Sequence, residues 1–240
     1  MSRYWEEMQY EQPDTAKLKK KAADTAKREK SKGKILEPIL IKGRKITQTW
    51  WGNAWCENLE KYADYSSRLD RGKRYVRTGT VVDLKIEKGK VTARVQGRRK
   101  TPYKVEVRIS PMSEIRCQEI IEICGNRIHN LETLVSGNIP EELKNVFTSD
   151  DGLFPKPKEI AFNCSCPDWA IMCKHVAAVL YGIGARFDED PLLFFRLRGI
   201  DVERFISVTL ESRVEKMLKN VNHKSNRILD DGMVGELFGI

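Results

Sequence analysis

The densest group of chemically active side chains in this 240-residue chain lies within twelve residues, which hold three of its six cysteines and one of its three histidines. Cys164, Cys166, Cys173 and His175 follow one another with the spacing Cys-x-Cys-x6-Cys-x-His. Thiolate sulfur and neutral imidazole nitrogen are the ligands that Zn²⁺ prefers, and four of them complete a tetrahedron. A complete Cys3His set leaves no position for water or substrate. The pattern therefore predicts one structural zinc ion and no chemistry at the metal.

The residues around this motif predict a strand before it and a helix after it. Residues 159–163 are typical of a short strand that delivers the first two cysteines, and Pro167-Asp168 makes a turn. The apolar run at residues 176–181 predicts a helix that begins near Cys173, and the positive end of a helix favours a thiolate. Buried, reduced cysteines are the alternative interpretation. A redox role is disfavoured because the Cys-x-x-Cys arrangement is missing.

This motif resembles the SWIM zinc finger, a module found with Swi/Snf-type helicase-like ATPases, plant Mutator transposases and some kinases. The segment at residues 162–181, FNCSCPDWAIMCKHVAAVLY, is similar to the small stand-alone SWIM proteins of prokaryotes. The segment Thr49–Trp55 and the ending Leu237–Ile240 look similar too, so the resemblance extends over most of the chain beyond its basic tail. It implies contact with DNA or protein, no catalytic residue, and the metal ligands Cys164, Cys166, Cys173 and His175.

The net charge of +9 is unevenly distributed along the chain. Residues 14–45 carry twelve Lys/Arg against four Asp/Glu, and residues 71–108 carry thirteen against three. Such concentrated positive charge predicts a polyanionic partner, for which nucleic acid is the usual candidate. A membrane surface is a weaker alternative because neither segment has the apolar stripe of an interfacial helix. Simple solubility is the other alternative.

Residues 79–109 alternate apolar and polar side chains with the period of two that is typical of strands. Turns near residues 87–90 and 97–102 divide them into three runs. The pattern predicts a three-stranded, or slightly larger, antiparallel sheet with one apolar and one charged face. Basic side chains on this face and its edge form a candidate phosphate-binding surface. Its candidate residues are Lys85, Arg94, Arg98, Arg99, Lys100, Lys104 and Arg108.

The N-terminal residues 1–34 are rich in Lys and Ala and are polar around every face. This composition predicts a disordered basic tail, because such a segment buries too little apolar surface to order itself. A loose basic arm can bind phosphates by releasing counterions. Its candidate contacts are Lys19, Lys20 and Lys21.

Three tryptophans, Trp50, Trp51 and Trp55, lie close together in a segment that predicts a helix. Core packing is the favoured interpretation, because aromatic side chains dominate core burial. A stacking platform for bases is the alternative. Three cysteines, Cys56, Cys117 and Cys124, lie outside the motif. Cys117 and Cys124 stand seven apart in an apolar helical pattern and are expected in the core, and the cysteine content indicates a reducing compartment.

Together these patterns predict an α+β fold, in which the antiparallel sheet packs with helices and is followed by a small zinc-finger module and C-terminal helices. We divide the chain into a basic tail (1–34), an α+β domain with the basic sheet (35–150), the SWIM module (151–200) and a C-terminal helix and tail (201–240). The apolar ending at residues 233–240 is either a docking peptide or a tail folded onto its own core.

No P-loop and no nucleophile elbow stand in the sequence. We therefore expect a non-enzymatic protein without a small-molecule substrate, which contacts nucleic acid, with DNA as the expected target. The resemblance implies a Swi/Snf-type helicase-like ATPase as a protein partner. The alternative function is an adaptor whose finger docks on a larger complex without touching nucleic acid. The polar N-terminus and the lack of a long apolar run predict a cytoplasmic or nucleoid-associated protein that does not use a membrane.

Overall fold

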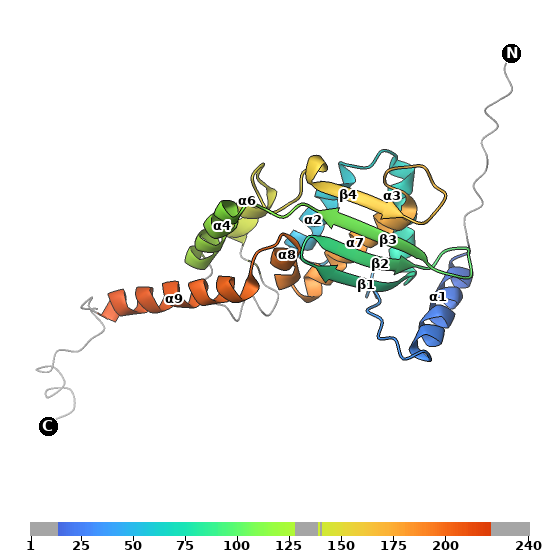
Figure 1. Ribbon diagram of the computed structural model, residues 1–240, viewed down its shortest axis with the longest axis horizontal. Helices are drawn as coiled ribbons and strands as arrows, with labels where there is room; N and C mark the ends of the chain where they lie inside the picture. Colours follow the sequence, from blue (N-terminus) through green and yellow to red (C-terminus); the bar gives the residue numbers. More distant parts are fainter. Residues whose placement is uncertain (1–13, 128–138, 140, 222–240) are drawn as a thin grey trace, which may run out of the picture.

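The protein is an α+β structure built around a four-stranded antiparallel sheet (Figure 1). Our computed structural model describes residues 14–127, 139 and 141–221. The strands are β1 (Val81–Glu87), β2 (Lys90–Val95), β3 (Tyr103–Ile109) and β4 (Ile160–Cys164), in that spatial order. The first three strands form the predicted meander. The fourth strand comes from the predicted finger segment and pairs with β3, so residues 35–150 and 151–200 share one sheet.

The register of the strands explains why the first zinc ligand faces the core. Leu84, Ala93, Val105 and Cys164 are successive pairing partners across the four strands. Directly paired residues lie on the same face of a sheet. The first three of these side chains are buried, so the row belongs to the inner face, and Cys164 joins it at the edge of the sheet.

The helix α7 (Lys174–Glu189) covers this inner face, and α2 (Trp50–Glu60) and α3 (Ser66–Arg77) lie on the far side of α7 from the sheet or beside it, packed against α7. The helix α7 touches all four strands and also packs against α2 and α3. The indole N–H of Trp55 donates to the carbonyl oxygen of Leu180 in α7 at 3.0 Å, and the Trp55 side chain is fully buried. Trp51 is buried in the same way. Trp50 is half-buried against the same core, so the core interpretation of the tryptophans is confirmed.

The other end of the molecule is helical. The helices α4 (Glu114–Arg127) and α9 (Val202–Val221) pack against each other beside the sheet (Figure 1). The short helix α8 (Leu192–Leu197) inserts Phe194 and Phe195 into the core. The remaining short helices are η1 (Glu141–Leu143), α6 (Lys144–Thr148) and η2 (Pro157–Glu159). The predicted C-terminal docking peptide at residues 233–240 lies outside the described residues.

The Lys-rich segment near the N-terminus forms a docked helix, α1 (Thr15–Lys30), which differs from the loose tail that its composition predicts. The buried residues of α1 are Leu18, Ala22, Thr25 and Glu29, spaced three or four apart along one face. The hydroxyl of Thr25 donates to Gln96 at 2.8 Å, and Glu29 forms an ion pair with Arg94 at 2.9 Å. Four well-placed residues thus hold a helix whose average composition indicates disorder.

Candidate metal centre

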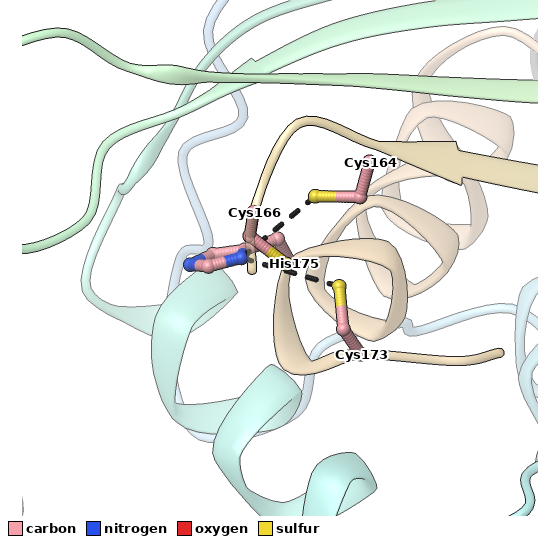
Figure 2. A group of neighbouring side chains, drawn as sticks. All are labelled: Cys164, Cys166, Cys173 and His175. Carbon is pink, nitrogen blue, oxygen red and sulfur yellow. Dashed lines mark hydrogen bonds between the residues drawn. The ribbon is translucent and has the colours of Figure 1, made fainter. Parts of the chain in front are cut away.

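Four side chains converge at one corner of the molecule, where β4 ends and α7 begins (Figure 2). The ligand atoms of Cys164, Cys166, Cys173 and His175 all lie within 4.8 Å of one another. Nδ1 of His175 lies 3.9 Å from the sulfur of Cys164 and 4.0 Å from the sulfur of Cys173. Four atoms at such separations fit around one ion with zinc–ligand bonds of about 2.0–2.3 Å.

Each ligand comes from a different point of a strand–loop–helix unit. Cys164 is the last residue of β4, and Cys166 lies in the turn that follows. Cys173 is the N-cap of α7, and its carbonyl oxygen accepts the first intrahelical bond from Ala177. His175 lies in the first turn of the same helix. The predicted strand and helix are both present, and their meeting point forms the site.

Backbone N–H groups surround the sulfur atoms in a way that suits a metal–thiolate site. The N–H groups of Cys166, Asp168 and Val176 donate to the sulfurs of Cys164, Cys166 and Cys173 respectively. Such bonds stabilise the charged form of each sulfur. They orient the ligands, as outer hydrogen bonds commonly do at metal sites.

The three thiols differ in how readily they ionise. A hydrogen bond from the Cys164 thiol lowers the pKa of Cys173 to about 4, and the same bond raises the pKa of Cys164. Burial raises the pKa of Cys166. Zinc takes all three as thiolates, so metal binding displaces the protons that the other two thiols hold. The donor set, its separations and its N–H groups all fit one structural zinc ion.

Aromatic side chains hold the imidazole of His175 in place. The Tyr103 ring stacks on it with 4.2 Å between ring centroids, and the Tyr75 ring meets it edge to face at 5.4 Å. The residue is 1% exposed, and no described residue accepts a hydrogen bond from Nε2. Gly97 leaves the necessary space, because a Cβ there would lie 2.5 Å from the Tyr103 ring and 3.3 Å from Nε2. Ring packing therefore orients this ligand.

The loop between the two ligand pairs is fixed from the side of α2 and α3. The carboxylate of Asp64 accepts the backbone N–H groups of Ile171 and Met172 at 2.9 and 3.2 Å. Asp168 forms an ion pair with Arg68 at 3.1 Å, and both side chains are largely buried. Nothing in the local sequence marks Asp64 and Arg68 as part of the site, because they lie about a hundred residues from the loop they hold.

The structure brings several of the predicted basic residues together at the end of the sheet that carries the zinc centre. Lys21 of α1 donates to the carbonyl oxygen of Arg98 at 2.7 Å. The guanidinium of Arg99 lies 5.1 Å from the centre of the Tyr103 ring, which in turn stacks on His175. Exposed side chains here define what we call the basic end. They are Lys21, Arg98, Arg99, Lys100 and Lys104.

The outer face of the sheet carries charges of both signs. Arg94 pairs with Lys104 across the strands, but the Arg94 side chain is bound to Glu29. Arg108 lies toward the opposite end of β3 and forms an ion pair with Glu106. The other predicted contacts, Lys85, Lys19 and Lys20, are exposed. The structure thus places Lys85 and Arg108 apart from the basic end, and their contact with phosphate stays a prediction.

The cysteines outside the motif take no part in the site. Cys124 is buried, and Cys56 and Cys117 are half-buried against the core. Burial raises the pKa of the Cys56 thiol to about 12. The core placement expected for Cys117 and Cys124 is therefore complete for Cys124 and partial for Cys117.

A closed Cys3His site at a strand–helix junction defines a zinc-finger protein whose metal holds structure. The finger is of the SWIM type: residues 163–182 match the SWIM zinc finger family, and this stretch contains all four ligands. The chain is also 33% identical over 180 residues to a protein of Mycobacterium tuberculosis (strain ATCC 25618 / H37Rv) named "Uncharacterized protein Rv2102". That alignment covers 74% of this chain and 65% of the relative, so the chain spans slightly less than two thirds of the relative's length. No solved structure matches the chain.

One exposed residue of the site was not among the candidates that the sequence indicated. Trp169, between the two ligand pairs, is 77% exposed. Sequence reasoning selected tryptophans by helical spacing, and Trp169 lies in a loop without periodicity. The signal in the sequence that could have identified Trp169 is its position between the two pairs of ligands.

Among the described residues, no helix is long and apolar enough to cross a membrane.

Proposed function

We propose that this zinc-binding protein is a non-enzymatic nucleic-acid-binding protein, with DNA as its target, and that the basic end contacts phosphates. The observation that carries the proposal is the contact between Lys21 and the carbonyl oxygen of Arg98. It joins the two basic segments of the sequence, which are far apart along the chain, into one surface beside the zinc centre.

The composition of this surface supports the proposal. Residues 97–104 hold four basic residues and no acidic residue. Exposed guanidinium and ammonium groups attract phosphate, and such contacts carry little sequence information. The outer face of the sheet, by contrast, has its charges partly neutralised by Glu29 and Glu106. We therefore place phosphate binding at the end of the sheet, and expect it to be insensitive to base sequence.

A salt series with labelled DNA tests this function. Fluorescence anisotropy of the zinc-loaded protein should show affinity that falls steeply as salt rises. The triple variant Arg98→Ala/Arg99→Ala/Lys100→Ala should lower the slope of log affinity against log salt by about 2 to 3, since each phosphate contact contributes about 0.7–0.9.

The matched control removes three charges from the opposite end of the molecule. Lys88, Lys144 and Lys158 are exposed there, and Lys88→Ala/Lys144→Ala/Lys158→Ala should leave the slope within experimental error. Equal losses in the two triple variants would mean that net charge alone attracts DNA. No binding by the unchanged protein at low salt would refute the function.

An adaptor role is the second candidate function, and one observation favours it. Four exposed apolar residues of α9 lie on one side of the helix, because the last three follow the first by four, seven and eight positions. They are Leu210, Val214, Met217 and Leu218. In this role a Swi/Snf-type helicase-like ATPase is the partner. Co-purification of such an ATPase that is lost on Leu210→Glu/Met217→Glu, with the melting temperature unchanged, would support it.

A further inference from the structure

We propose that Trp169 of the zinc loop stacks on a base of single-stranded nucleic acid, within an exposed patch that also contains Tyr65 and Ile171. This proposal rests on the nucleic-acid function proposed above and adds the form of nucleic acid and the residue that contacts the base. Three properties of the patch carry it: the exposure of its aromatic ring, its rigidity and its position beside the basic end.

The first property is the exposure of a large aromatic side chain, whereas two other tryptophans in the described part of the chain are buried. Trp169 is 77% exposed and Ile171 is 72% exposed, whereas Trp51 and Trp55 are 3% and 0% exposed. The Tyr65 ring meets Trp169 edge to face with 5.4 Å between centroids, which leaves the indole exposed.

The second property is the rigidity of the loop that presents the indole. Trp169 lies between the ligands Cys166 and Cys173, so zinc fixes the chain on both sides. The backbone of the loop donates two hydrogen bonds to Asp64, and the neighbouring Asp168 pairs with Arg68. A loop that is already ordered loses little conformational entropy when it binds, so more of the free energy of its contacts contributes to affinity.

The third property is the position of the patch relative to positive charge. The zinc loop begins at Ser165, whose backbone N–H donates to the carbonyl oxygen of Lys104 and whose hydroxyl accepts from the Lys104 N–H. The loop and the 97–102 connection therefore leave the same end of the sheet, where α1 also lies (Figure 1). Phosphates held at the basic end would therefore lie at the same end of the sheet as the loop that carries the indole.

The chemistry of the patch favours an unpaired strand over the alternatives. Bases of a single strand are free to stack on an aromatic ring, and this contact tolerates any sequence because every base has a π-face. Bases of a duplex already stack on their neighbours and would have to leave the helix first. The two carboxylates beside the indole, Asp64 and Asp168, are occupied by N–H groups and a guanidinium, which reduces their repulsion of phosphate.

The test compares two variants on two probes, a labelled oligothymidylate and a labelled duplex of equal length. Trp169→Ala should weaken binding of the single strand by about 5- to 150-fold, the range that loss of one stacked base produces. Trp169→Phe should restore most of this loss, and duplex binding should change less than twofold. Binding of the single strand should quench tryptophan emission in the unchanged protein and quench it much less in Trp169→Phe.

The control and the remaining outcomes separate this proposal from the function on which it rests. Ile115→Ala removes an apolar side chain that is 72% exposed on α4, and it should leave binding of both probes unchanged. Full single-strand affinity in Trp169→Ala, with unchanged zinc content, would overturn the stacking proposal while leaving phosphate binding intact, and would make the patch a protein-docking surface. If the unchanged protein bound neither the single strand nor the duplex, both the stacking proposal and the nucleic-acid function would be refuted.

Discussion

Glu29 connects the Lys-rich helix α1 to Arg94 on the charged face of the sheet. Its side chain is 5% exposed and lies 2.9 Å from Arg94 and 3.0 Å from Lys34. A buried carboxylate with two cationic partners stays ionised, because removal of its charge would leave those partners uncompensated. The hydrogen bond from Arg94 is the main cause that lowers the pKa of Glu29 from 4.5 to about 2.

The docking of α1 should consequently depend on pH. The pKa of Glu29 is lower in the folded protein, so its stabilising effect is complete above about 4.5 and is lost as pH falls toward about 2. Hydrogen exchange, corrected for intrinsic rates, should show α1 amides losing protection over this range before β2 amides do. Glu29→Gln should lower α1 protection already at pH 7, whereas Glu57→Gln, at an exposed position of α2, should not. Equal α1 protection in the Glu29 variant would mean that the ion pair does not hold the helix.

At the scale of elements, α7 both carries the zinc ligands Cys173 and His175 and forms the centre of the core. Close packing around α7 depends on residues with small side chains or none. Gly72 of α3 crosses α7 at Ala177, where a Cβ on Gly72 would lie 2.5 Å from the Ala177 Cβ and 3.0 Å from its backbone. Neither of these atoms belongs to a flexible side chain that can move aside. The approach of α3 to the zinc helix therefore requires glycine at this position.

Gly72→Ala should destabilise the protein by about 1–3 kcal/mol, the usual cost of overpacking a core. The sign of this change in stability is informative, because alanine is favoured over glycine in a helix by about 1 kcal/mol and would otherwise stabilise α3. Ser67→Ala, at an exposed position of the same helix, should change stability by less than about 0.5 kcal/mol. Chemical denaturation of the zinc-loaded protein measures both values. A more stable Gly72 variant would show that the helices have room to separate at no cost.

At the scale of the whole molecule, the sequence predicted what depends on local spacing. The zinc ligands follow from four positions within twelve residues, and the meander of β1 to β3 follows from alternation along neighbouring runs. The pairing of β4 with β3 and the docking of α1 on Gln96 and Arg94 join residues that are far apart in sequence. No local period encodes such contacts. The average composition of the N-terminal segment does not predict this docking, because four residues on one face determine whether α1 docks.

The shared sheet changes what zinc is expected to stabilise. A separate finger would unfold alone when its metal is removed. Here the ligands are attached to β4, which completes the sheet, and to α7, which fills the core beneath all four strands. Structural zinc contributes about 10–16 kcal/mol of apparent binding free energy in finger peptides, and whole domains are stable by about 5–15 kcal/mol. A metal contribution in this range would be as large as the stability of an entire domain.

Removal of zinc should consequently unfold the sheet together with the finger in one transition. Chelation, or Cys173→Ser, should abolish amide protection in β1 and β2 and shift tryptophan emission to that of exposed side chains, because Trp55 lies against α7. When the zinc-loaded protein is heated, far-UV circular dichroism and tryptophan fluorescence should change at the same temperature. Cys117→Ser, the same substitution at a half-buried thiol outside the motif, should keep its zinc and its cooperative melting. Protected β1 and β2 amides in the zinc-free protein would show that the metal stabilises its own loop alone, and that the sheet folds without it.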